Sequence, residues 1–252
     1  MKKISSLVFV GLMTSYAFGH NLWVKASNKD VVKAQMIYGH DFPNPEPIAQ
    51  ERLSLFNPIE VVAEKETLIL SQKGEEYNYE GKKPLQEGTY IVKVVYKPTA
   101  WIEKADGKWE MNKTRKDSKE EVKHCGIYSM FGKSILVVGD SDGAFATKAL
   151  GKGFEITPLV KASEFKKDTP IKFRLTRDGK RVKMTDVYGS FGGFSEDEMS
   201  MAFYAKTDLK GEFVFKPLKS GLWYLKADYK QESGNADCEH IGDKTTLSFE
   251  VR

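Results

Sequence analysis

The sequence predicts an all-β protein of two β-sandwich domains with an immunoglobulin-like or transthyretin-like architecture. Short segments of alternating apolar and polar residues recur along most of the chain, and clusters of Gly, Asn, Asp and Lys separate them. Over residues 139–153 this pattern gives way to a linker rich in Gly, Ala and Ser, after which it starts again. We therefore expect an N-terminal domain over residues 20–140 and a C-terminal domain over residues 153–252.

The first domain should contain several strands and one short helix. The segments with β-branched, aromatic or alternating residues are Leu22–Ala26, Val31–Tyr38, Thr67–Ser71, Thr89–Tyr96 and Ile135–Val138. Three prolines make Asp41–Pro47 an extended loop that cannot be a central strand. Val122, Cys125 and Tyr128 recur every three residues among Lys and Glu, which predicts the helix over residues 115–130.

The second domain should contain about seven short strands. They are expected at Phe154–Leu159, Pro170–Thr176, Arg181–Tyr188, Met201–Lys206, Glu212–Lys216, Leu222–Tyr229 and Thr245–Val251. Asp178-Gly179 predicts a tight hairpin turn between two of them. This spacing is close to that of an immunoglobulin-like or transthyretin-like sandwich.

The N-terminus has the pattern of a secretory signal peptide over residues 1–19. Two lysines precede a short apolar run, and small residues follow at Ala17 and Gly19. Cleavage after Gly19 makes His20 the new terminus, whereas cleavage after Ala17 leaves two residues before His20. The apolar run is too short for a stable membrane anchor, so the mature chain is expected in the periplasm without insertion into the membrane.

The charge balance argues against a strongly basic surface of the kind that binds nucleic acids. The full chain has a formal charge of +4, and without its first 19 residues it has 37 basic against 35 acidic side chains. Charges of both signs are scattered along it, which is typical of a solvated surface and not of a nucleic-acid-binding protein.

The two cysteines, Cys125 and Cys238, are expected to form a disulfide, since an even number in an oxidising compartment favours one. The alternative is a pair of thiolates on a soft metal ion. A His lies next to Cys125 and another two residues after Cys238, so a bridge would bring His124 and His240 close together. A purely structural bridge with two incidental histidines is the competing interpretation.

All four histidines occupy positions that suit a metal ligand. His20 at a processed terminus would offer an amine and an imidazole, and His40 opens the Pro-rich loop. We predict a metal site formed by His20, His40, His240 and His124. The neighbouring carboxylates, Asp41 and Glu239, are expected to support the ligands. Nitrogen ligands favour Ni(II), Co(II), Cu(II) or Zn(II) over Mg(II) or Ca(II).

No motif of a hydrolase or zinc peptidase is present: there is no Gly-x-Ser-x-Gly and no His-Glu-x-x-His sequence. We therefore expect a binding protein and not an enzyme. An oxidative copper enzyme is the alternative, since a histidine brace uses the same two histidines.

Two motifs resemble a known family. The segments His20-Asn21-Leu22-Trp23 and Gly39-His40-Asp41-Phe42-Pro43 are similar to those of the periplasmic proteins associated with nickel/cobalt uptake transporters of the energy-coupling-factor type. The resemblance continues more loosely through Gly221-Leu222-Trp223-Tyr224. It implies a two-domain β protein that binds Ni(II) or Co(II) through His20 and His40 and passes the ion to a membrane metal-uptake transporter. A copper carrier and a metal-free interaction module are the alternatives.

Overall fold

The computed structural model describes residues 19–195, 197 and 200–252, so the predicted signal peptide lies outside it except for Gly19. The predicted all-β class is confirmed, because strands dominate this part of the chain. Its only helical elements are four short 3-10 helices: η1 (Gln50–Leu55), η2 (Arg115–Asp117), η3 (Ala144–Thr147) and η4 (Ala162–Glu164). Among the described residues, no helix has the length and apolar character needed to span a bilayer.

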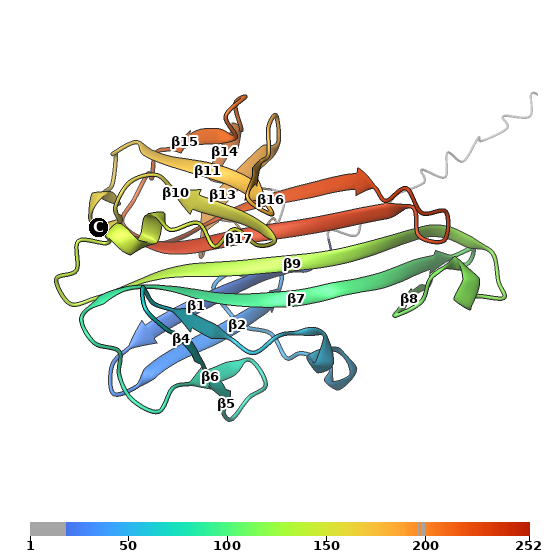
Figure 1. Cartoon of the computed structure of the whole chain (residues 1–252), viewed down its shortest axis with the longest axis horizontal. Coiled ribbons are helices and arrows are strands. Elements are labelled where there is room, and N and C mark those ends of the chain that lie inside the picture. The colour runs from blue at the N-terminus through green and yellow to red at the C-terminus, as the bar shows by residue number, and fades with distance from the viewer. Residues whose placement is uncertain (1–18, 196, 198–199) are drawn as a thin grey trace, which may run out of the picture.

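The strands form three sheets (Figure 1). The N-terminal sheet has the order β1 (Asn21–Asn28), β2 (Val32–Gly39), β6 (Asn78–Glu80) and β5 (Ser71–Gln72). The central sheet has the order β14 (Phe203–Lys206), β13 (Asp186–Phe191), β16 (Gly221–Glu232), β17 (His240–Val251), β9 (Val122–Val138), β7 (Gly88–Lys104), β3 (Glu60–Val62) and β4 (Thr67–Ile69), with β8 (Trp109–Met111) also paired to β7. The C-terminal sheet has the order β10 (Phe154–Pro158), β11 (Ile171–Arg177) and β12 (Lys180–Arg181), with β15 (Glu212–Phe215) on the other side of β11.

The middle of the central sheet is buried on both faces. Along β9, Met130 and Leu136 pack into the core under the N-terminal sheet, while Phe131 and Ile135 pack into the core under the C-terminal sheet. Successive side chains of a strand point to opposite faces, so even-numbered residues of β9 face the N-terminal sheet. The two sandwiches therefore share one sheet. Figure 1 shows β7, β9 and β17 running between the two outer layers.

This sharing bears on the predicted domains. The boundary at residues 139–153 remains a prediction, but the central sheet continues across it, because β17 pairs in parallel with β9 from His240↔Gly126 to Ser248↔Ser134. A buried ion pair also joins the halves: Nζ of Lys133 on β9 lies 2.7 Å from Oε2 of Glu155 on β10.

The predicted helix over residues 115–130 is wrong. The segment begins with η2 and continues as β9, which pairs with β7. In a strand, residues three apart face opposite sides, so the recurrence of Val122, Cys125 and Tyr128 did not define one face. Cross-strand pairing with the long β7 overrides the weak helical pattern.

Other predictions of local structure are confirmed. Asp178-Gly179 forms the hairpin between β11 and β12 with φ of 49° and 75°, the positive values that a tight two-residue turn requires. The loop Asp41–Pro47 contains no strand. The expected strand Thr89–Tyr96 extends to Lys104, and its single proline, Pro98, lies in the register shift between Tyr96 and Thr99, where a missing N–H is tolerated.

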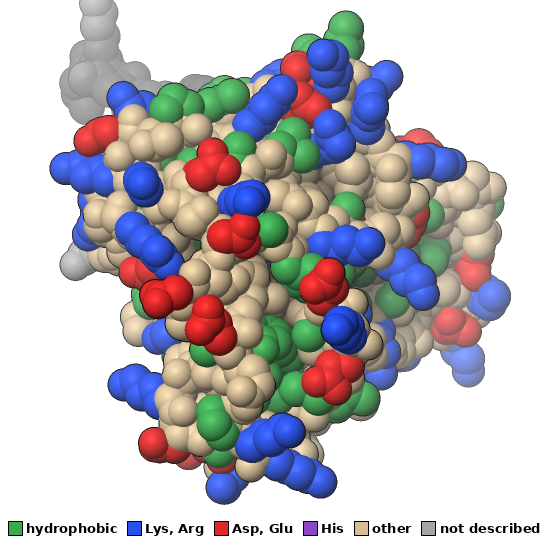
Figure 2. All heavy atoms as spheres, turned by 60° about the vertical axis from the view of Figure 1, so that its left-hand side comes forward, with side chains coloured by type: hydrophobic (Ala, Val, Ile, Leu, Met, Phe, Trp, Pro, Cys, Tyr) green, Lys and Arg blue, Asp and Glu red, His purple; other side chains and the backbone are tan. Residues whose placement is uncertain are grey.

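Basic and acidic side chains alternate over the face of the molecule shown in Figure 2, without a large patch of one sign. This distribution matches the near balance of charges in the sequence.

Candidate metal centre

His20 is placed by contacts between the first and the last strand. The Thr246 hydroxyl donates to the Leu22 carbonyl oxygen over 2.6 Å, which aligns β1 with β17. Lys244 lies two residues before Thr246 on β17. Its ammonium donates to the carbonyl oxygens of Gly19 at 2.7 Å and of His20 at 3.2 Å. His20 therefore lies over the central sheet on the side covered by the N-terminal sheet.

His20 and His40 lie together, as predicted. Their ring centroids are 4.7 Å apart at an interplanar angle of 40°. The antiparallel pairing of β1 with β2 places Asn21 opposite Gly39. His20 directly precedes β1 and His40 directly follows β2, so the two histidines lie at adjacent strand ends. Tyr38 stacks on the His20 ring at 4.6 Å and 11°, which fixes the orientation of that imidazole.

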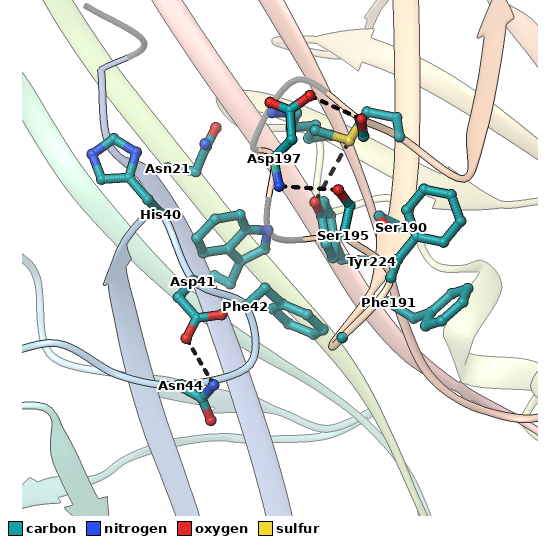
Figure 3. Close-up of a pocket in the computed structure, with 16 residues that line it drawn as sticks. Asn21, His40, Asp41, Phe42, Asn44, Ser190, Phe191, Ser195, Asp197 and Tyr224 are labelled. Carbon is teal, nitrogen blue, oxygen red and sulfur yellow. Dashed lines mark hydrogen bonds between the residues drawn. The ribbon is translucent and has the colours of Figure 1, made fainter.

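A carboxylate that contacts the His40 segment is that of Glu46, which the sequence analysis did not single out; the supporting role of Asp41 remains a prediction. The backbone N–H of His40 donates to Oε1 of Glu46 over 2.9 Å. A Cβ at Gly39 would overlap this carboxylate, so a larger residue there would require the Glu46 side chain to move. Asp41 instead accepts a hydrogen bond from the Asn44 side chain at 2.9 Å (Figure 3).

The surroundings of His20 keep its ring neutral. Burial lowers the pKa of His20, and the nearby His40, Arg52 and Lys244 lower it further, against the opposing effect of Glu46. A neutral imidazole is the form that binds a metal ion.

A cavity of about 620 Å³ opens beside His40 (Figure 3). It lies between the Pro-rich loop and the central sheet, and its apolar wall includes Trp23, Phe42 and Tyr224, whose rings are 4.7–5.7 Å apart. Burial raises the pKa of Tyr224 to about 12, so this phenol stays protonated. His40 is therefore reached from a partly apolar cavity.

The other two histidines form a second pair. The rings of His124 and His240 stack at 4.7 Å and 23°. His240 is four residues from Lys244 along β17, a separation of roughly 13 Å between their Cα atoms in an extended strand. The structure thus brings the four predicted ligands together as two pairs, His20 with His40 and His124 with His240, and not as one cluster.

The predicted disulfide is confirmed, and it lies directly behind the second pair. Cys125 and Cys238 are bonded, with their Cα atoms 4.7 Å apart. Their side chains pack with Ile102 in a small buried cluster, while His124 faces the other side of β9. Such a bridge is typical of proteins that reach an oxidising compartment.

Glu239 lies beside the second pair, as predicted, and is held by an arginine. The Arg115 guanidinium donates to its two carboxylate oxygens at 2.9 and 2.5 Å, and the backbone N–H of Cys125 donates at 3.1 Å. The hydrogen bonds from Arg115 are the main reason that the pKa of Glu239 falls to about 2. One ligand atom from each of His124, Glu239 and His240 lies within 4.8 Å of the others.

Tyr128 fixes the His124 ring. Its hydroxyl lies 2.6 Å from Nε2 of His124. The phenol ring can lie across β9 and β17 because Gly126 and Gly242 carry no side chains, and a Cβ on either would collide with it. Burial lowers the pKa of His124, and His240 lowers it further.

A cleft of about 410 Å³ is lined by His20 and by several aromatic rings. One of these rings is Trp109, which contacts His124 edge-on at 5.7 Å. Figure 1 places β8, which carries Trp109, toward the end of the molecule where β7 and β9 extend past the N-terminal sheet.

Sequence reasoning missed Glu46, Arg115 and Tyr128 as neighbours of the histidines. Tyr128 could have been found, because it lies four residues after His124 and thus on the same face of a strand. The contacts of Glu46 and Arg115 depend on loop conformation, for which the sequence carries no comparable signal.

No curated protein matches the chain. Among solved structures, the D0-D1 domain of Intimin matches at 12% identity over 90% of this chain and 96% of that chain, but its TM-score of 0.21 is too low to support an argument. The sequence model of a domain of unknown function, DUF4198, matches residues 17–231. The chain therefore belongs to the DUF4198 family.

Proposed function

We propose that the processed chain binds a transition-metal ion, Ni(II) or Co(II), in the periplasm and delivers it to a membrane uptake transporter. The observation that supports this function is the pair His20 and His40, whose ring centroids are 4.7 Å apart at the predicted mature terminus. Cleavage after Gly19 would add the α-amine of His20 as a third nitrogen. Three nitrogens suit Ni(II), Co(II) or Cu(II).

The charges around the pair fit this role. The neutral His20 ring needs no deprotonation near pH 7, because its pKa is lowered by burial and by neighbouring cationic groups. Glu46 provides a negative charge next to His40. The amine, with an ordinary pKa of about 7.7–8, is then the group whose protonation competes with the ion. Binding should therefore weaken as the pH falls below about 7.

Calorimetry with Ni(II) on protein that begins at His20 tests the proposal. His20→Ala and His40→Ala should each lower the affinity of this site by more than the 10–100-fold typical of losing a supporting residue. One extra residue before His20 should also weaken binding, since it moves the amine. An unchanged affinity after His20→Ala or His40→Ala would contradict this ligand set.

Two neighbouring acids give a matched pair of controls. Glu46→Gln should weaken binding by about 10–100-fold, because Glu46 contacts the His40 backbone. Asp41→Asn should have little effect, because that carboxylate is turned toward Asn44. The transport step requires a second assay: cells that lack this protein should take up less radioactive Ni(II), and the His20→Ala variant should not restore uptake.

A copper site is the second candidate function. The His20 amine and imidazole together with the His40 imidazole are the ligands of a histidine brace, and the ring distance suits it equally. Competition between Cu(II) and Ni(II) under matched buffering, together with an assay for copper-dependent peroxide consumption, separates this function from Ni(II) delivery. Purified protein that retains no metal ion and binds none would instead favour the interaction module.

A further inference from the structure

Several contacts hold the stacked rings of His124 and His240 in place. The two rings are 4.7 Å apart and come from β9 and β17, which are adjacent parallel strands. His240 pairs with Gly126, so His124 lies two residues away on the same face of the sheet. Both imidazoles therefore face the same small space.

Three independent contacts hold this geometry in place. The disulfide fixes the chain next to His124 and two residues before His240. The Tyr128 hydroxyl bonds to one nitrogen of His124 at 2.6 Å and leaves the other for a ligand. Arg115 holds Glu239 through both carboxylate oxygens. Oε1 of Glu239 accepts from both Arg115 and the Cys125 N–H, whereas Oε2 has a second lone pair with which Glu239 can contact an ion while Arg115 remains bound.

One ring nitrogen is left without a hydrogen bond. Nδ1 of His240 is buried, and although Oε1 of Glu232 lies 3.2 Å away, the two are not aligned as a hydrogen bond. A buried polar atom without a partner costs about 1–3 kcal/mol, so a structural role alone leaves this atom unexplained. Glu232 and Glu239 also place negative charge near the two rings.

We propose that His124, His240 and Glu239 form a second metal site, which binds a divalent transition-metal ion such as Zn(II) or Ni(II). Two imidazoles and one carboxylate are an ordinary ligand set for such ions, with water completing the coordination. The ligand atoms are within 4.8 Å of one another, so side-chain rotations of about an ångström bring them to bonding distances near 2.0–2.2 Å.

This site is independent of the one at the terminus. It uses no α-amine, so the chain with and without its first 19 residues should both bind an ion there. Lys244 contacts the His20 carbonyl oxygen, and its Cα atom lies roughly 13 Å along β17 from that of His240, so the two pairs occupy different parts of the sheet. The second site can therefore exist even if the proposed function of the His20 pair is wrong.

Metal stoichiometry tests the proposal. We expect calorimetry and elemental analysis with Ni(II) and Zn(II) to give two ions per chain for protein that begins at His20. The double variant His20→Ala/His40→Ala should keep one ion, and His124→Gln/His240→Gln should also keep one. A chain with all four substitutions should bind none. An ion count that is the same in the wild type and in the His124→Gln/His240→Gln variant would overturn the second site. One ion in the wild type that this variant loses would instead refute only the site at His20 and His40.

Two further measurements guard against misfolded variants and adventitious binding. In the wild-type protein, Ni(II) should broaden the imidazole NMR signals of His124 and His240, and sharp signals at saturating ion would refute the site without any substitution. Glu239→Gln should weaken binding, whereas Glu232→Gln, at a neighbouring exposed acid, should change it less. An affinity no tighter than that of a single exposed imidazole would mean adventitious binding and would also refute the proposal.

Discussion

The buried ion pair between Lys133 and Glu155 should be a major determinant of stability. Lys133 projects from β9 toward the C-terminal sheet, and the side chains of both residues are almost fully buried, with 6% and 3% exposed. Glu155 also accepts hydrogen bonds from the backbone N–H groups of Leu150 and Gly151, at 3.1 and 2.8 Å. The pair thus connects the central sheet, the linker and β10.

The informative change is Lys133→Met, which keeps an unbranched apolar side chain and removes the ammonium. It leaves a buried carboxylate without its counter-ion, which costs about 3–5 kcal/mol. The two remaining N–H donors offset part of this, so we expect a loss near 3 kcal/mol. At about 2–4 °C per kcal/mol for a chain of this size, the melting temperature should fall by roughly 6–12 °C.

Urea denaturation of the wild type and the variant measures the loss, and two controls sharpen it. Lys93→Met breaks a partly exposed pair with Glu60, 3.0 Å long on the neighbouring strand, and should cost no more than about 1 kcal/mol. Adding Glu155→Gln to Lys133→Met should restore most of the stability, since the amide oxygen can still accept from the backbone. A loss below about 1 kcal/mol for Lys133→Met would refute the reasoning.

The loss should also depend on pH in a fixed direction. Without the ammonium, burial raises the pKa of Glu155 in the folded variant above its unfolded value. The folded state then takes up a proton at a higher pH than the unfolded state does, so the stability of the Lys133→Met variant should rise as the pH is lowered through that raised pKa toward the unfolded value. Equal losses at pH 7 and pH 5 would contradict this assignment of the buried charge.

Two further predictions concern the disulfide and an acidic group. Replacing Cys125 and Cys238 with Ser removes a cross-link that spans 113 residues. Because the unfolded chain is then less constrained, the free energy of unfolding should fall by about 4–5 kcal/mol, which a lower midpoint of urea denaturation would show. The hydrogen bonds of Glu212 to Lys172 and Arg174 lower its folded-state pKa to about 2, below the ordinary value of 4.5. Its stabilising contribution is therefore complete above about pH 4.5 and is lost as the pH falls toward 2, so Glu212→Gln should lower the melting temperature at pH 7 and leave it nearly unchanged at pH 2. An equal effect at both pH values would be inconsistent with a charge-dependent contact.

The sequence predicted the fold class and part of the candidate site for identifiable reasons. The strand alternation and the Asp178-Gly179 turn are local signals, and the structure confirms them. The proximity of His124 and His240 followed from a disulfide that the even number of cysteines predicted. These inferences needed no knowledge of how distant strands pair.

The errors arose where distant pairing decides the outcome. The separation of the four histidines into two pairs depends on the alignment of β1 with β17 and of β9 with β17, which no local pattern encodes. The same holds for residues 115–130, where pairing with β7 produces a strand from a sequence with a weak helical period. Glu46 was missed because the Pro-rich loop turns its side chain back to a backbone group six positions earlier.

The contact between β1 and β17 imposes an order in time. The Leu22 carbonyl and the Thr246 hydroxyl that bonds to it are 224 positions apart, and Lys244 reaches His20 over the same span. While a chain is still emerging from the ribosome, or crossing a membrane with its N-terminal end first, His20 and His40 are present but the surface that supports them is not. Any ligand that needs the finished surface could be captured only after the last strand has arrived, so an incomplete chain would compete poorly for such a ligand.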